Sequence, residues 1–257
     1  MQRSTTQKLV AALLLCAVPA SAWAADGIGP FTSGVPSAQP AVGSPPNVYS
    51  SDFTASPVAT GTDALENPSG VITTFGQLSS GANTEPDENT YLNFENGLKG
   101  PTPKYNYGTH FLIQGHEGAG NLSYVTRINL DVSDPAHRIT LLTPVGGDGL
   151  THLNRTDGST YNPFTKSMLF TQEGSGTDGG LYEIAIRWPS TLTTRYGAIG
   201  RCGLEGVKID NKGRIYLVED TGGQGVSNDK NDINGPNKVA KQPTPMCSAL
   251  SRTTKAI

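Results

Sequence analysis

The amino-acid sequence predicts an all-β fold. From residue 105 onward helical periodicity is almost absent, and short runs of β-branched and aromatic residues alternate with turns rich in Gly, Asn and Asp. The runs that favour strands are residues 109–114, 124–131, 138–144, 167–172, 181–186 and 214–218. Because no helical segment separates these short runs, we expect them to pair as antiparallel sheets.

A weak internal repeat indicates how the sheets are arranged. The segments "NPFTKSMLFTQE" (residues 162–173) and "DNKGRIYLVED" (residues 210–220) share turn residues, a basic residue, four largely apolar positions and a terminal acid. Repeats of roughly 40 to 50 residues built from short strands are typical of propeller blades. The sequence thus predicts a partial β-propeller of about three blades after a disordered N-terminal arm. A two-sheet sandwich would have similar strands, but it does not explain why both copies end in acid.

The N-terminal residues 1–24 have the organisation of a signal peptide. Two basic residues precede an apolar run at residues 9–18, and small alanines follow it. The run is too short to span a bilayer, so we expect Sec-type export to the periplasm or the extracellular space and no membrane association after cleavage.

Residues 25–104 are expected to form a low-complexity linker or arm. Their hydrophobic residues are isolated and follow neither a helical nor a strand period, so little apolar burial offsets the entropy of ordering. The one exception is a short strand expected at residues 70–75. The folded part is predicted to begin near Tyr105 and to extend over residues 105–242.

Carboxylates stand at the ends of several predicted strands. Glu173 ends the first repeat, Glu219 and Asp220 end the second, and Glu205 precedes the strand of the second repeat. Glu117 ends the strand that begins near residue 109. In a propeller such ends converge on the central channel, where mutual repulsion is relieved by a cation. We therefore predict these five carboxylates as ligands of a hard cation such as Ca²⁺.

The alternative for each acid is a solvated turn residue, since carboxylates that flank strands usually lie in water. His116, which precedes Glu117, is more typical of a surface or core histidine than of a ligand. The loop at residues 221–238 is polar and glycine-rich, but it places lysines where an EF-hand requires ligands.

Several function classes are excluded or disfavoured. The net charge of -3 offers no basic surface for nucleic acid or anionic lipid. Beyond the signal peptide only Cys202 and Cys247 remain, so a disulfide-rich scaffold is excluded. The sequence contains no nucleophile elbow, phosphate-binding glycine loop or zinc-protease motif.

Three segments together resemble secreted bacterial proteins related to PhoX-type alkaline phosphatases. They are "GNLSYVTRINLDVSDPAHRITLLTP", "YNPFTKSMLFTQE" and "GLEGVKIDNKGRIYLVEDTGG", and the resemblance covers roughly half of the chain, residues 105–241. It implies a β-propeller whose channel holds calcium and iron (Ca²⁺ and Fe³⁺) and hydrolyses a small phosphorylated molecule. Within it, Glu173 and Glu205 correspond to acids implied in catalysis, and Glu219 with Asp220 to a metal-binding strand end.

The chain departs from this family at two points. The family's metal-binding cysteine has no counterpart between residues 26 and 201, and the twin-arginine export signal is replaced by a single Arg3. The alternatives are a non-catalytic secreted propeller that binds calcium and a ligand or partner, and a lactonase-like or phytase-like propeller hydrolase. The missing cysteine favours the non-catalytic protein, whereas the acidic strand ends favour a hydrolase.

The tail at residues 243–257 breaks the pattern. No strand alternation remains there, whereas the family continues with a further strand. A reading frame shifted by one base permits a valine in place of the Met246–Cys247 junction, with a strand-like sequence around it. We therefore expect this tail to be a frameshifted segment of a longer protein, with a genuine short tail as the alternative.

Overall fold

The computed structural model describes residues 48–50, 52–118, 120–174 and 179–220, together with three short strands in residues 225–250. Two compact units are distinguished, residues 1–57 and residues 58–257. In the first unit, the described residues 48–50 and 52–57 form no helix or strand and are mostly exposed. The predicted signal peptide lies outside the described residues.

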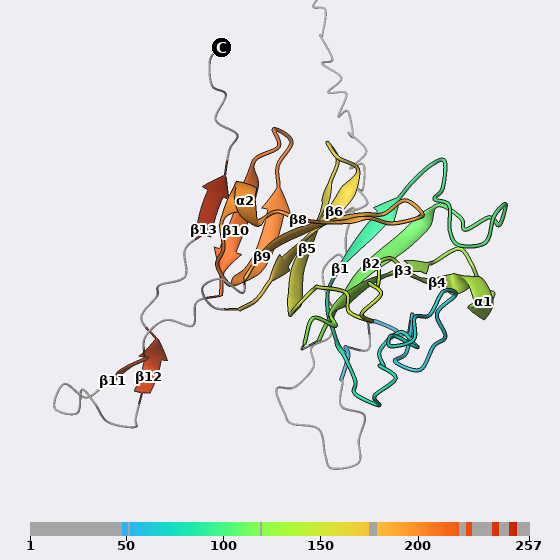
Figure 1. Cartoon of the computed structure of the whole chain (residues 1–257), viewed down its shortest axis with the longest axis horizontal. Coiled ribbons are helices and arrows are strands. Elements are labelled where there is room, and N and C mark those ends of the chain that lie inside the picture. Colours follow the sequence, from blue (N-terminus) through green and yellow to red (C-terminus); the bar gives the residue numbers. More distant parts are fainter. Residues whose placement is uncertain are drawn as a thin grey trace, which may run out of the picture. The chain divides into compact units, whose positions relative to one another are not determined.

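The second unit contains antiparallel sheets, as predicted (Figure 1). The first sheet is a meander of four strands: β1 (Glu85–Asn93), β2 (His110–Glu117), β3 (Tyr124–Asn129) and β4 (Ile139–Leu141). The second has the same order: β5 (Thr156–Asn162), β6 (Ser167–Gln172), β7 (Gly180–Ala185) and β8 (Leu192–Thr194). The third joins β9 (Leu204–Ile209), β10 (Ile215–Glu219) and β13 (Cys247–Leu250). A separate ribbon pairs β11 (Gly225–Ser227) with β12 (Lys238–Lys241).

Helix is confined to two single turns among the described residues, α1 (Pro135–Arg138) and α2 (Tyr196–Ile199). In the first, the side chain of Asp134 accepts a hydrogen bond from the backbone N–H of Ala136 and Pro135 opens the turn, so the helix starts without an unsatisfied donor. No described helix is long and apolar enough to cross a bilayer.

The three sheets stack face to face, and an apolar cluster fills the space between each neighbouring pair. Phe111 and Ile113 of the first sheet pack against Phe170 and Tyr182 of the second. On the other side of the second sheet, residues of β6 and β7 pack against residues of β9 and β10. Strand β6 is therefore buried along its whole length, which explains why the apolar residues at its centre are consecutive rather than alternating with polar ones.

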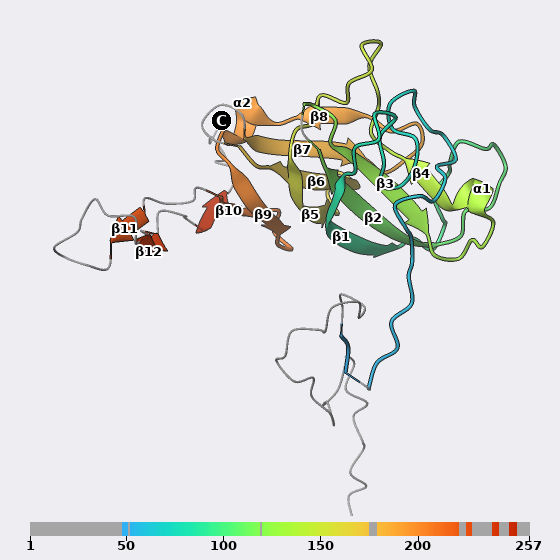
Figure 2. The same cartoon turned by 90° about the horizontal axis from the view of Figure 1, so that it is seen from below.

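The first strands of the sheets lie next to one another, β1 beside β5 and β5 beside β9 (Figures 1 and 2). Side chains from all three join there. The backbone N–H of Ser159 donates to Glu88, and the Lys208 ammonium donates to Glu88 (2.7 Å) and to the carbonyl of Ser159 (2.9 Å). These contacts hold the three strands side by side.

The prediction that order begins near Tyr105 is wrong. Strand β1 lies within the segment predicted as an arm, and Leu65, Ile72 and Phe75 are buried against the outer face of the first sheet. Isolated bridges at residues 64 and 74, 72 and 78, and 77 and 83 fold the segment back on itself. Its hydrophobic residues share no period because tight turns, rather than a helix or strand, bring them to one cluster. The strand expected at residues 70–75 is replaced by these bridges.

The last described strand also differs from the sequence prediction. Residues 247–250, placed in a tail without strand character, form β13 and pair with β10 from Ile215↔Leu250 to Val218↔Cys247. The reading frame of the tail stays a prediction, because strand pairing through the backbone does not depend on the side chains that the frame specifies.

Candidate metal centre

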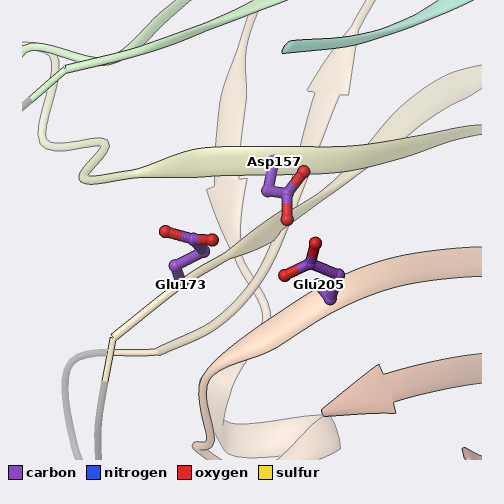
Figure 3. Close-up of side chains that lie close together, drawn as sticks. All are labelled: Asp157, Glu173 and Glu205. Carbon is purple, nitrogen blue, oxygen red and sulfur yellow. The ribbon is translucent and has the colours of Figure 1, made fainter. Parts of the chain in front are cut away.

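Three carboxylates meet where the beginnings of β5 and β9 lie close to the end of β6. Asp157, Glu173 and Glu205 each offer an oxygen, and these oxygens lie within 4.8 Å of one another. Figure 3 shows the three side chains facing a common space. Glu173 and Glu205 were predicted from the sequence, whereas Asp157 was not. Side chains far apart in sequence therefore converge in space.

A β-bulge places Asp157 in the group. The pairing of β5 with β6 shifts register between Thr156 and Ser159, so Asp157 and Gly158 lie in an irregular stretch of the strand. Strand β1 has an equivalent shift between Pro86 and Asn89, which contains Asp87. Bulges redirect a side chain out of the regular alternation. Because of these irregular stretches, neither strand has the period-two hydrophobicity by which a strand is predicted from its sequence.

A glycine permits the close approach of β5 to β9. A Cβ atom on Gly158 would lie 2.4 Å from the carbonyl oxygen of Glu205, which is a severe overlap. The Thr171 hydroxyl also donates to that carbonyl (3.2 Å) and so ties β6 to β9. The backbone of Glu205 is thus held against the second sheet while its side chain remains exposed.

Asp157 is the most buried member, with 8% of its surface exposed. Its Oδ2 atom is buried and has no hydrogen-bond partner in the described part of the chain. Burial raises the pKa of this carboxyl to about 8, and so do a hydrogen bond that the protonated carboxyl donates to Asp87 and the charges of Asp87, Glu205 and Glu173. An ionised carboxylate in this position therefore requires a positive partner.

Further acids surround the three. Burial raises the pKa of Glu173, and the charges of Glu117, Asp220 and Glu205 raise it further. Burial and the charges of Glu85 and Asp87 likewise raise the pKa of Glu117, while Arg155 opposes them. The position of Glu117 at the end of β2 matches that of Glu173 after β6 and Asp220 after β10, so the second strand of each of the three larger sheets delivers an acid to this region.

Two predicted features lie elsewhere. Glu219 ends β10 at a register shift in its pairing with β9, and among the described residues it does not join the three carboxylates. Its charge acts on the Cys202 thiol, whose pKa is raised first by burial and then by Glu219. His116 is fully buried, stacks on Tyr124 at 4.3 Å and contacts Thr126 through Nε2 (2.9 Å). Burial lowers its pKa to about 3, as for a neutral core histidine.

The donor set fits a hard cation. Carboxylate oxygens are the ligands that calcium prefers, and the orphaned Oδ2 of Asp157 supplies a buried, unsatisfied acceptor among them. Cys202, by contrast, packs against the apolar cluster between the second and third sheets, and within the described residues it does not join the three carboxylates. The cysteine ligation that the family resemblance implies for iron therefore does not fit these residues.

Comparisons with protein-family models, with curated proteins and with solved structures found no match to this chain.

Proposed function

We propose that this chain is part of an exported calcium-binding β-propeller of the PhoX-like class, in which Asp157, Glu173 and Glu205 hold the cation. The observation that carries the proposal is the buried, unpartnered oxygen of Asp157 among carboxylates from separate strands. Without a cation, mutual repulsion and the cost of burying charge would favour protonated carboxyl groups or side chains that point away from one another. With one, the same residues satisfy part of the six to eight oxygen ligands that Ca²⁺ takes.

Three features support the propeller architecture. The first two sheets are four-stranded meanders of the same order, the third repeats their first two strands, and the first strands β1, β5 and β9 lie next to one another. Blades of a propeller have this order, with their first strands around the central channel. The acids stand at one end of these strands, where a channel mouth would be.

The activity we propose is hydrolysis of a phosphate monoester, which follows the resemblance of the three sequence segments. A bound calcium ion would polarise the phosphoryl group and stabilise the charge that develops on it. Asp157, being buried, serves to hold the cation. Glu205 is exposed and Glu173 is half-buried, so these two carboxylates are accessible to a substrate, and they are the proposed catalytic pair.

Export to the periplasm or the extracellular space is part of the same proposal. It rests on the basic, apolar and small-residue order of residues 1–24. Calcium is abundant outside the cell, where weak extracellular modules bind it with dissociation constants of about 10⁻⁴ to 10⁻³ M.

Calcium binding and turnover are tested separately. Isothermal titration with CaCl₂ should show one saturable site that is lost in Asp157→Asn and retained in Glu95→Gln, an exposed acid outside the cluster. Hydrolysis of 4-nitrophenyl phosphate should then require calcium and fall at least about a hundredfold in Glu205→Gln. No calcium binding by the parent protein would overturn the whole proposal.

A second candidate function is a non-catalytic calcium-binding propeller. It is favoured by the absence of Cys202 from the carboxylate group, because the resemblance assigns a cysteine to the catalytic metal site. Calcium binding without hydrolysis of aryl phosphate or aryl lactone would support this candidate. Cleavage of the lactone alone would assign a lactonase-like activity instead.

A further inference from the structure

A second cavity lies at the opposite end of the second sheet from the carboxylates. Its volume is about 510 Å³, within the range of about 300 to 1,000 Å³ that is usual for small-molecule sites. Its walls include the beginning of β6, the end of β7 and the loop that follows β1. From Ser167, which lines the cavity, to Glu173 the strand rises by about 20 Å, so the two sites are separate.

One side of the cavity is apolar and aromatic. Phe94 and Leu98 contribute from the loop after β1, and Ile186 contributes from the end of β7. Phe94 is fixed by edge contact with Tyr161, their ring centroids lying 5.7 Å apart. This wall belongs to the cluster between the first two sheets, so it is held by the protein core rather than by a free loop.

The other side carries an excess of positive charge. Lys166, Arg187 and Arg195 line the cavity, against a single acid, Glu183. Glu183 is buried, accepts from the Ser167 hydroxyl and pairs with Arg195, so these two charges compensate each other. Lys166 and Arg187 are exposed and form no ion pair within the described residues of the chain.

A further cation lies behind the apolar wall. The side chain of Arg127 is completely buried, and its Nη1 donates to the carbonyl of Ile186 (3.3 Å) and to that of Lys99 (3.0 Å). Its guanidinium lies over the ring of Phe111, 5.2 Å from the centroid. Burial lowers its pKa to about 10, which leaves it charged at neutral pH. It forms no ion pair in the described part of the structure, but the charge of Glu66 acts on it, so only part of its field adds to that of Lys166 and Arg187.

We propose that this cavity binds a small organic anion, with Arg187 and Lys166 holding its carboxylate or phosphoryl group and Phe94, Leu98 and Ile186 packing against its apolar body. The site is independent of the carboxylate group and does not require the proposed hydrolysis. A carboxylate and a phosphoryl group share the chemistry that an arginine recognises, so both are included in the test.

The test uses the full chain in calcium buffer and two probes that cannot be hydrolysed as phosphate esters, phenylphosphonate and benzoate. Titration followed by NMR should show saturable shifts for the backbone amides of residues 166, 167 and 183–187. Inorganic phosphate lacks the aromatic ring and benzyl alcohol lacks the anionic group. Each should therefore bind at least about threefold more weakly than phenylphosphonate. The stronger of the two probes identifies the anionic group.

Two variants locate the site. Arg187→Glu should weaken phenylphosphonate binding at least about tenfold, and Lys166→Asn, which tolerates the left-handed backbone at that position (φ 54), by about threefold or more. Lys212→Glu makes the same charge change as Arg187→Glu in an exposed turn, and should alter binding by less than about twofold. Glu205→Gln should likewise leave it unchanged, which separates this site from the carboxylates.

Three outcomes would overturn the proposal: no saturable binding of either probe up to about 10 mM, equal binding by the parent and Arg187→Glu, or loss of binding in Glu205→Gln. The last result would place the anion at the metal centre.

Discussion

Asp157→Asn should remove the pH dependence of stability that the Asp157 carboxyl imposes on the metal-free protein. An ionised aspartate and its two neighbours, with oxygens within 4.8 Å, repel by about 3.5 kcal/mol per pair at an effective dielectric constant of about 20. That energy corresponds to about 2.5 pKa units per neighbour. This repulsion is an upper bound, because two neighbours at that strength would by themselves exceed the rise of the Asp157 pKa from 3.8 to about 8. Burial and Asp87 are the larger causes of the rise, and solvent screens the charges of Glu205 and Glu173.

The direction of the effect follows from proton binding. Between pH 3.8 and about 8 the folded protein keeps a proton on Asp157 that the unfolded chain has released. Raising the pH through this window therefore lowers the free energy of unfolding, by at most about 1.4 kcal/mol per pH unit. Because the neighbouring acids are partly solvated and share the shift, we expect a loss of about 1 to 3 kcal/mol from pH 6 to pH 9.

The assay is thermal unfolding in a chelator at about pH 6 and about pH 9. The parent protein should lose about 2 to 10 °C in Tm between these conditions relative to Asp157→Asn, whose amide carries no titratable proton. Glu95→Gln should behave as the parent. Excess calcium should restore the parent at the higher pH, by about 2.7 kcal/mol at a hundred times the Kd, and should not restore Asp157→Asn.

Parallel pH profiles of the parent and Asp157→Asn in chelator would refute this reasoning, since Asp157 would then not carry the raised pKa. Equal calcium stabilisation of both proteins would remove Asp157 from the ligand set.

Two further predictions concern the packing that holds the group together. Gly158→Ala should lower the free energy of unfolding by about 1 to 3 kcal/mol, because its Cβ would overlap the Glu205 carbonyl; urea unfolding measures this, with Gly147→Ala, which meets no atom within 4 Å, as control. A loss no greater than that of Gly147→Ala would contradict the close approach of β5 and β9. Burial raises the pKa of Glu66, but hydrogen bonds from Tyr107, Thr102 and His137 outweigh it and leave the pKa lowered. The ionised Glu66 therefore contributes stability above its unfolded pKa, and this contribution is lost as the pH falls through its folded pKa. The stability of Glu66→Gln should accordingly depend less steeply on pH than that of the parent below about pH 5. Identical acid profiles would mean that Glu66 is not ionised in the folded protein.

Some elements were predictable because their own residues specify them. Strands β2, β3, β6, β7 and β10 have β-branched or aromatic runs bounded by turn residues, and they lie close to the predicted positions. The acids at their ends, Glu117, Glu173 and Asp220, could be identified because strand ends of successive repeats are equivalent positions. For His116 the sequence favoured a surface or core histidine over a ligand, and its complete burial makes it a core residue.

The sequence patterns missed the elements that depend on contacts with residues far away along the chain. Strands β1 and β5 contain bulges and polar residues, β8 is only three residues long, and in β9 every third residue rather than every second is buried. Leu65, Ile72 and Phe75 are buried only because turns and isolated bridges bring them against the first sheet. No period along the chain could report such contacts.

The sequence by itself determined the all-β class and the positions of most apolar strands, because strand propensity and turn residues act over a few neighbouring positions. It also located Glu173 and Glu205. Only the tertiary structure decided that Asp157 joins them and that Glu219 does not, because shifts in strand register at both positions orient the side chains. Which carboxylates share one space depends on how separate sheets stack, and stacking is a property of the whole core rather than of any segment.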